Sequence, residues 1–329
     1  MTTPQLLGLR TRVAAITPPD EESAWQEHIP FGKVLIELLE PRVIVELGVH
    51  TGASYLGFCE AVMELGLASA CYGIDTFCGD EHAGAYGGEV ERKLRTQHDP
   101  RFGHFSRIIT STFDDAVAHF ADGSVDLLHI DGLHSYEAAR HDFDTWLPKL
   151  SERAVVLFHD THVRERDFGV WRVWDEVSAR YPHFAFLHGH GLGVLAVGAK
   201  ISDRLRPLFE LDTAAAERVG EWFFAAGNRI TLQVSLARMS KDLSMTAEAL
   251  RHHKSELERR TTELRRTQHQ LADAQDAQMR QQVELVAVRR ETAEWQALVR
   301  KLSSSLSFRL GMSATAPLRW VKSKLSRDD

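Results

Sequence analysis

The sequence predicts an α/β fold: a doubly wound, mostly parallel sheet of about seven strands, followed by a long C-terminal helix that forms a coiled coil. Two patterns indicate this. Over the first 200 or so residues, short continuous apolar runs alternate with helix-length amphipathic segments, as in βαβ crossovers of a parallel sheet. Farther on, glycine is absent from 228 to 310 and leucines recur every seven residues, as in a coiled coil.

Five parallel strands are expected where apolar residues run without alternation, because both faces of such a sheet are covered. They are 42–48, 71–77, 106–110, 125–131 and 154–160. Helices are expected at 53–67, 137–150 and 169–181. The last two apolar runs, 183–189 and 192–198, are separated by two residues, and we expect them to form an antiparallel hairpin that closes the sheet.

These patterns divide the chain into five segments. They are a helical lead-in over 1–34, the α/β domain over 35–205, a helical connector over 206–235, a coiled coil over 236–305 and a basic amphipathic tail over 306–329.

The heptad repeat has one apolar row and one polar row. The apolar row consists of Leu236, Leu243, Leu250, Leu257, Leu264, Leu271 and Leu285, with Gln278 in the gap. The positions that would face it are polar or small, from Ala247 and Lys254 to Gln282. We expect a weakly held homo-oligomer, because a helix of this length is not stable alone. An isolated solvated helix is the alternative.

The tail interleaves basic side chains such as Arg319 and Lys322 with apolar ones such as Trp320. Such a segment can lie on an anionic bilayer surface, or it can dock on its own oligomer. Both interpretations stay open.

Composition excludes several classes of protein. Hydrophobic residues make up 43% and charged residues 26% of the chain, and the formal net charge is -7, which disfavours general nucleic-acid binding. Cys59, Cys71 and Cys78 show no metal-site spacing and fit a reducing compartment. Neither a signal peptide nor an apolar run of about 18 residues occurs. We expect a cytoplasmic protein. Peripheral contact of its C-terminal tail with the inner membrane face stays open.

A glycine loop follows the first strand. In "VELGVHTGAS", Glu46, Gly48 and Gly52 form an E-x-G-x-x-x-G arrangement that opens a helix. Glycines there allow a sharp turn and close approach of a ligand, and a carboxylate suits a cationic or hydroxyl-bearing ligand. Asp75 ends the second strand and is placed to receive two ribose hydroxyls. Dinucleotide enzymes place an acid similarly, so Asp75 alone does not discriminate between cofactors.

Four stretches, "VIVELGVHTGASY", "GIDTFCGDEHAGAYGGEV", "DLLHIDGLHSYEAARHDFDTWLPKL" and "VVLFHDTHVRERDFGVWRVWDEV", resemble class I S-adenosylmethionine-dependent methyltransferases. More narrowly, they resemble the bacterial branch of macrocin O-methyltransferase and cephalosporin-hydroxylase-like proteins, which is associated with polysaccharide biosynthesis and natural-product modification. The resemblance covers about 35 to 200. It implies a Rossmann-like fold, with Glu46, Gly48 and Gly52 near the methionine part of S-adenosylmethionine, Asp75 on its ribose, and Ser111 and Thr112 near its adenine.

Acids also end the fourth and fifth strands, at Asp131 and Asp160. Adjacent strands lie about 4.8 Å apart, so the two carboxylates can share a divalent cation such as Mg²⁺. This resembles catechol-type methyltransferases, in which the third ligand is an Asn where Thr161 stands here. That departure leaves the metal open.

Histidines crowd the same region. His134 is our first choice for the base that removes a hydroxyl proton, with Asp131 beside it, and His159 is the second. The alternative is that these are ordinary surface or core residues among the 17 histidines of the chain. Residues 77–90 combine glycines, acids and aromatics and are expected to form a lid or a plain surface loop.

The resulting function is methyl transfer from S-adenosylmethionine to a hydroxyl of a sugar, a glycan or another small molecule. Two alternatives stay open. One is an NAD-dependent oxidoreductase on the same architecture, which the missing G-x-G-x-x-G disfavours. The other is a non-catalytic binding or scaffold protein that works through its coiled coil.

Overall fold

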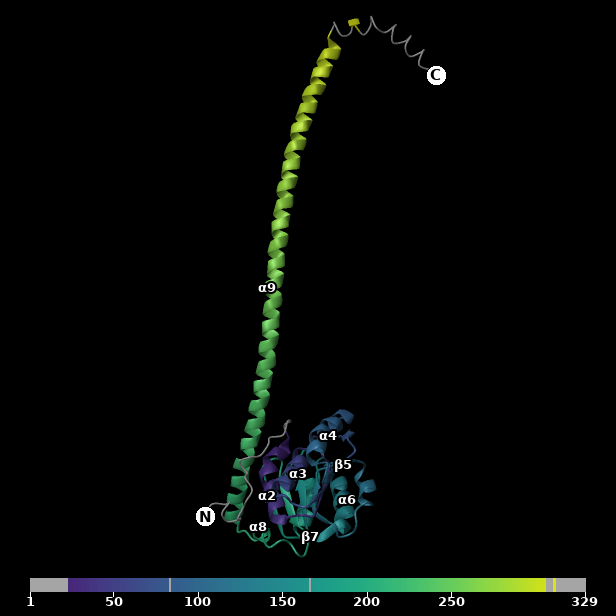
Figure 1. Ribbon diagram of the computed structural model, residues 1–329, viewed down its shortest axis with the longest axis vertical. Coiled ribbons are helices and arrows are strands. Elements are labelled where there is room, and N and C mark those ends of the chain that lie inside the picture. Colours follow the sequence, from purple (N-terminus) through teal and green to yellow (C-terminus); the bar gives the residue numbers. More distant parts are fainter. Residues whose placement is uncertain (1–22, 83, 166, 306–309, 312–329) are drawn as a thin grey trace, which may run out of the picture. The chain divides into compact units, whose positions relative to one another are not determined.

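The computed structural model describes residues 23–82, 84–165, 167–305 and 310–311 (Figure 1). The chain divides into two compact units, residues 1–242 and 243–329, and each is considered by itself. Most of the predicted helical lead-in and nearly all of the predicted basic tail, including Arg319, Trp320 and Lys322, lie outside the described residues.

The first unit is built on a seven-stranded sheet in the order β5-β2-β1-β6-β7-β9-β8. Its strands are β1 Val43–Leu47, β2 Ala70–Asp75, β5 Ser106–Thr110, β6 Val125–Ile130, β7 Leu150–His159, β8 His183–Phe186 and β9 Leu192–Ala196. The first five of these run parallel to one another, whereas β9 is antiparallel to both β7 and β8. The predicted sheet, with its closing hairpin, is therefore confirmed.

Helices cover both faces of this sheet, and each face has its own apolar core. On one side, η2 Ala24–His28, α2 Ile29–Leu39, α3 Ala53–Leu65 and α4 Gly88–Phe102 contribute Trp25, Phe31, Phe58 and Phe102. On the other, α5 Phe113–Val117, α6 Tyr136–Trp146 and α7 Val170–Ser178 contribute Phe143, Trp146 and Trp174. The short helices η3 Leu147–Lys149 and α8 Arg206–Phe209 complete the unit.

Two details differ from the sequence-based expectation. The predicted loop at 77–90 contains a small antiparallel pair, β3 Gly79–Asp80 and β4 Gly84–Ala85, and leads directly into α4. Strand β7 begins at Leu150, because the polar stretch that precedes Ala154 is extended too. Polar residues at the start of a buried strand hide it from an apolar-run criterion.

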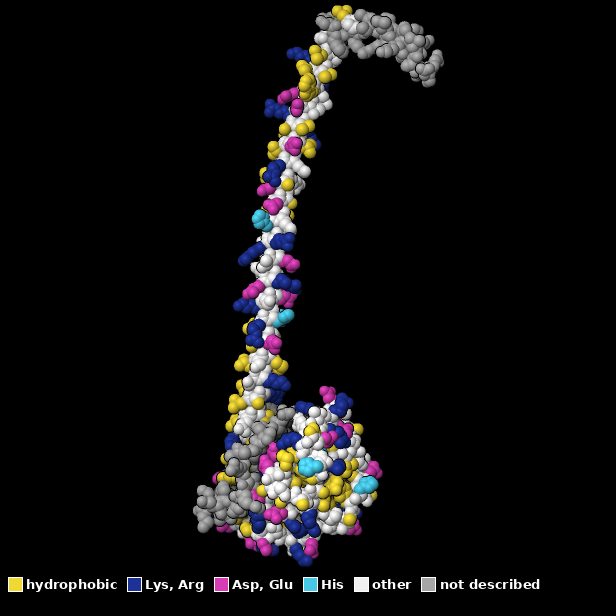
Figure 2. All heavy atoms as spheres, in the orientation of Figure 1, with side chains coloured by type: hydrophobic (Ala, Val, Ile, Leu, Met, Phe, Trp, Pro, Cys, Tyr) yellow, Lys and Arg dark blue, Asp and Glu magenta, His cyan; other side chains and the backbone are white. Residues whose placement is uncertain are grey.

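The long C-terminal helix is confirmed. Helix α9 runs without interruption over Thr213–Ser304, 92 residues, and so begins inside the predicted connector. Val219, Phe223 and Ile230 of its first turns are buried in the core of the first unit. In the second unit the heptad leucines are exposed, Leu243 by 72% and Leu257 by 66%, and apolar side chains stand among charged ones along the helix (Figure 2). The coiled coil stays a prediction.

None of the helices within the described ranges is both long enough and apolar enough to cross a membrane.

Candidate active site

A cavity of about 340 Å³ lies beyond the carboxyl ends of the parallel strands. In a doubly wound sheet this edge is where ligands collect. Its wall includes the loop after β1, the end of β2 and the residues that follow β6 and β7. Its lining includes Trp25, Gly48, Asp75, Phe113, Asp131, His134, His159, Asp160 and His190.

The glycine loop has backbone angles that favour glycine. Gly48 has φ of +90°, and a Cβ there would collide with the carbonyl oxygen of Asp131. Gly52, with φ of +86°, is the N-terminal cap residue of α3, and a Cβ there would collide with Leu94. Both predicted glycines thus let the backbone turn tightly, and Gly48 lines the cavity.

Asp75 ties this loop to the end of β2. Its Oδ2 accepts hydrogen bonds from the backbone N–H groups of Val49 at 2.9 Å and His50 at 2.8 Å. Its Oδ1 accepts one from Phe77 at 2.7 Å. A carboxylate has about four lone-pair positions, and the backbone occupies three of those of Asp75. Oδ1 therefore keeps capacity for one ligand hydroxyl, which leaves less room than the predicted bidentate hydrogen bonding of two hydroxyls requires.

Glu46 is not among the residues that line the cavity. It is fully buried and lies behind the cavity wall. Its Oε1 accepts a hydrogen bond of 2.6 Å from the hydroxyl of Ser54, and its Oε2 lies 3.2 Å from Nδ1 of His129. Because side chains alternate along a strand, Glu46 points into the helix layer rather than out beyond the strand end. Its place near the methionine part of a cofactor stays a prediction.

Ser111 and Thr112 also lie outside the cavity lining. The Ser111 N–H donates to the carbonyl of Asp75 at 3.0 Å, and the Thr112 hydroxyl caps α5 by accepting from the N–H of Asp115 at 3.1 Å. The next residue, Phe113, does line the cavity. An apolar ring directly after a helix cap was the available sequence signal, and it suits an adenine better than the two hydroxyls.

The strand-end acids and histidines do converge. His134 Nε2 lies 2.9 Å from Asp160 Oδ2 and 3.6 Å from Asp131 Oδ1. His159 Nδ1 lies 3.0 Å from Asp131 Oδ1, and its Nε2 lies 3.0 Å from the carbonyl of Gly189. His190, which the sequence analysis missed, places Nδ1 3.1 Å from Asp160 Oδ1.

This cluster changes the ionisation of its members. Burial would raise the pKa of Asp131, but the neighbouring His159 and His134 hold that pKa well below its usual range. Burial would lower the pKa of His134, but Asp131 and Asp160 raise it to about 10, and the same two acids raise the pKa of His159 to about 9. In the free protein both imidazoles are therefore protonated at neutral pH, and neither is a ready base.

The same side chains form a candidate cation site. Asp131, His134 and Asp160 can each offer one ligand atom, with all three atoms within 4.8 Å of one another. Two carboxylates and an imidazole nitrogen are a suitable donor set for a divalent ion, so these residues fit the predicted metal. Thr161, at the position of the third ligand in the proteins that the chain resembles, is buried outside the cavity lining, whereas His134 can offer a third ligand atom beside the two acids.

The segment 77–90 contributes to the wall of the cavity. Gly79, Asp80 and Tyr86 line the cavity, and the Tyr86 ring lies 4.7 Å from that of His50. On another side of the cavity, the ring of Phe168 stacks on the ring of His134. Their centres lie 4.7 Å apart and the angle between their planes is 7°. The segment 77–90 therefore forms part of the cavity wall, and its role as a lid or a plain surface loop stays a prediction.

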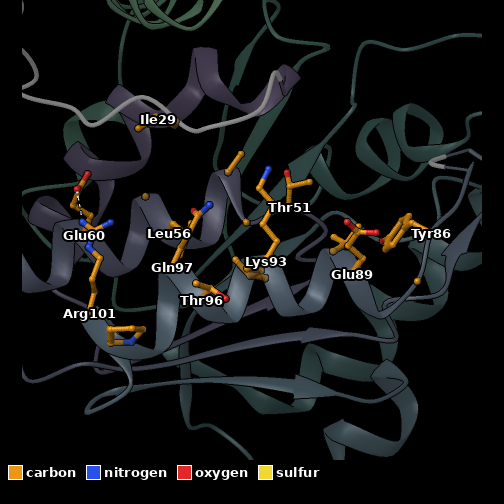
Figure 3. Close-up of a pocket in the computed structure, with 17 residues that line it drawn as sticks. Ile29, Thr51, Leu56, Glu60, Tyr86, Glu89, Lys93, Thr96, Gln97 and Arg101 are labelled. Atoms are coloured by element: carbon orange, nitrogen blue, oxygen red, sulfur yellow. Dashed lines mark hydrogen bonds and ion pairs between the residues drawn. The ribbon is translucent and has the colours of Figure 1, made fainter. Parts of the chain in front are cut away.

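A larger hollow of about 730 Å³ lies beside the cavity, between α3 and α4 (Figure 3). Its wall is mostly apolar, with Leu56 and Val90 among its lining, and the ion pair of Glu60 and Arg101, 2.9 Å apart, stands at one end. The two hollows share Thr51, Ala53 and Tyr86 in their linings. The glycine loop thus separates them.

The sheet order, the glycine loop after β1 and the acid that ends β2 are arranged as the resemblance to class I S-adenosylmethionine-dependent methyltransferases predicts. Residues 45–161 match the family described as "Methyltransferase domain". This matched region contains the glycine loop, Asp75, Asp131 and Asp160.

Sequence similarity to one relative extends beyond these residues. An uncharacterised protein of Sinorhizobium fredii (strain NBRC 101917 / NGR234) is 44% identical over 239 residues, which are 72% of this chain and 26% of that protein. The chain therefore spans about a quarter of the length of this relative.

Two solved structures are similar at low identity. A methyltransferase from Geobacter sulfurreducens is 17% identical, with 53% of this chain and 80% of that chain covered and a TM-score of 0.40. The O-methyltransferase TomG from Streptomyces achromogenes, involved in tomaymycin synthesis and solved with S-adenosylmethionine, is 15% identical, with 60% and 100% covered and a TM-score of 0.40.

Proposed function

We propose that the chain transfers the methyl group of S-adenosylmethionine to a hydroxyl oxygen of a small-molecule acceptor, a sugar or glycan by the resemblance, with help from a divalent cation. One observation carries the proposal. Asp131, His134 and Asp160 converge in the same cavity as the glycine loop and Asp75, so an acceptor oxygen at the cation and a methyl donor on the loop would be neighbours.

The reaction asks little of the protein beyond positioning and proton removal. The acceptor oxygen attacks the methyl carbon, the carbon–sulfur bond breaks with its electron pair on sulfur, and the hydroxyl proton leaves to a base. When bound, the cation would lower the pKa of the acceptor hydroxyl. Asp131 and Asp160 would hold the cation, and His159 would orient Asp131 through its 3.0 Å contact.

His134 has two roles open to it in this proposal. As a third ligand it would give up its proton when the cation binds, because only the neutral imidazole ligates. As the base it needs the same loss, since its pKa in the free protein is about 10. The imidazole donor also suits Fe²⁺ or Zn²⁺, and the two carboxylates suit Mn²⁺, so the predicted Mg²⁺ is to be compared with these ions.

The test is transfer of an isotopically labelled methyl group from S-adenosylmethionine to a panel of hydroxylated acceptors, with and without added divalent ions. Asp131→Asn should abolish transfer, while Asp144→Asn, on the exposed side of α6 beside Arg140, should not change it. Label transferred from a nicotinamide cofactor instead would favour the oxidoreductase. An Asp131→Asn chain that keeps full cellular function would favour the scaffold.

The second unit has a separate proposed role. We propose that the exposed heptad leucines of α9 associate with those of a second copy, because an apolar row repeated every seven residues is the signature of a coiled coil. Such an assembly would hold several methyltransferase domains together, and a basic tail beyond it would suit a place near the inner membrane face.

A further inference from the structure

Four buried polar side chains form a chain beneath the cavity, outside the acid–histidine cluster. They are Trp25 of η2, His129 of β6, Glu46 of β1 and Ser54 of α3, with exposed fractions of 2%, 0%, 0% and 4%. They come from four different elements, and Trp25 is 104 residues from His129 in the sequence. Buried polar groups linked over such separations are costly unless they are mutually satisfied.

The hydrogen bond from Trp25 fixes the state of His129. The indole Nε1–H lies 2.9 Å from Nε2 of His129, and an indole can only donate. Nε2 is therefore the acceptor, and the ring hydrogen sits on Nδ1. That atom faces Glu46 Oε2 at 3.2 Å, at an angle poorer than that of a good hydrogen bond.

The other oxygen of Glu46 is held by Ser54, whose hydroxyl donates to Oε1 at 2.6 Å. Both carboxylate oxygens thus face a hydrogen-bearing group. Burial raises the pKa of Glu46, whereas His129 and Ser54 act to lower it. With His129 neutral, ionised Glu46 gives the chain one net negative charge. If the ring hydrogen moved to Nε2, a lone pair would face the carboxylate instead. Trp25 prevents this exchange.

Both ends of the chain reach the cavity. Trp25 and Ser54 line it, and Gly48, Val49 and Thr51, which lie between Glu46 and Ser54 in the sequence, line it as well. The carboxylate of Glu46 is therefore fixed directly behind the glycine loop. A charge in such a position is weakly screened by water and salt.

We propose that Trp25 and His129 are positioning residues that hold Glu46 as an oriented buried carboxylate, and that this charge makes the cavity prefer the cationic methyl donor over its product. The inference rests on the proposed function. Methyl transfer leaves the electron pair of the broken bond on sulfur, so the sulfonium becomes a neutral thioether. S-adenosylhomocysteine then lacks one positive charge that Glu46 attracts, which favours product release.

The test compares binding of S-adenosylmethionine and S-adenosylhomocysteine to the full chain by titration calorimetry. Trp25→Phe keeps an aromatic ring but removes the indole donor. We expect it to lower the preference for S-adenosylmethionine about five- to tenfold, mainly through weaker binding of the cationic ligand. Trp146→Phe is the matched control, because Trp146 is equally buried, lies in the other core and has an indole N–H without a partner among the described residues.

Glu46→Gln should lower the preference for S-adenosylmethionine over S-adenosylhomocysteine at least as much as Trp25→Phe does, and Ser54→Ala should also lower it. Ser54→Ala serves as the test if the buried replacement at 25 or 46 prevents folding. An affinity ratio in folded Trp25→Phe or Ser54→Ala chains equal to that of wild type would overturn the inference and leave the proposed function standing. Failure of folded wild-type chain to bind either ligand would instead overturn the proposed function.

Discussion

His134 Nε2 and Asp160 Oδ2 lie 2.9 Å apart, and this contact links the loop after β6 to the end of β7. Asp160 has a left-handed backbone conformation, with φ of +58°. Such conformations in residues other than glycine are uncommon and cluster at functional sites. The pair has consequences for stability, for metal binding and for pH dependence.

In metal-free protein, His134 should stabilise the fold at neutral pH and cease to do so in alkali. Its folded pKa of about 10 lies above the ordinary value of 6.5, so the stabilisation is fully present below pH 6.5 and is lost as pH rises through 10. We expect His134→Gln to be less stable than wild type by about a few kcal/mol at pH 6. Thermal unfolding in EDTA from pH 6 to 10.5 would show the difference in stability between wild type and His134→Gln becoming smaller as the pH rises.

The control is His141→Gln. His141 is exposed and pairs with Asp114 at 2.7 Å, and an exposed pair contributes little, so its loss should have a small effect at every pH. A gap between wild type and His134→Gln that does not change with pH would contradict this assignment.

Cation binding should release protons. Because His134 is protonated in the free protein and only its neutral form ligates, uptake of Mn²⁺ at pH 7 should release roughly one proton per ion. Calorimetry in two buffers of different ionisation enthalpy measures this number. Asp160→Asn should weaken binding at least tenfold, while Asp144→Asn binds as wild type does; equal binding by the two variants would place the ion elsewhere.

Gly48→Ala should disrupt the glycine loop after β1. The substitution places a Cβ against the Asp131 carbonyl at a φ of +90°, and that backbone strain alone costs about 1–2 kcal/mol. We expect loss of S-adenosylmethionine binding and a lower unfolding midpoint.

Gly220→Ala in α9 is the matched control for this change. Nothing lies within 4 Å of a Cβ at Gly220, and alanine in a helix interior is favoured over glycine by roughly 0.5–1 kcal/mol. This variant should be slightly more stable than wild type and should bind normally. Equal effects at the two positions would show that the loop has no special role.

Self-association through α9 should depend on the leucine row. Replacing Leu257 and Leu264, 66% and 59% exposed, by Ser should shift the chain to monomer in light scattering after size-exclusion chromatography. Replacing Arg259 and Arg266, two residues farther along the same helix, by Ser leaves the row intact and should not. A wild-type chain that is monomeric at all concentrations would exclude the proposal.

The sequence alone determined the architecture. The apolar runs of β1, β2, β5 and β6, the short spacing of the β8–β9 hairpin and the heptad of α9 are local patterns, and the structure confirms the elements that they predict. Strand ends also carry their own signal: an acid directly after a buried strand lies at the ligand edge of a parallel sheet, so Asp131 and Asp160 were found.

Only the tertiary structure decided which of these side chains share a cavity. Glu46 lies behind the wall, Ser111 and Thr112 lie beside it, and Phe113, Trp25 and His190 enter it. A strand pattern tells which face a residue is on but not what packs over that face. Trp25 meets His129 across 104 residues, and contacts over such separations depend on how whole helices settle on the sheet, which no local spacing encodes.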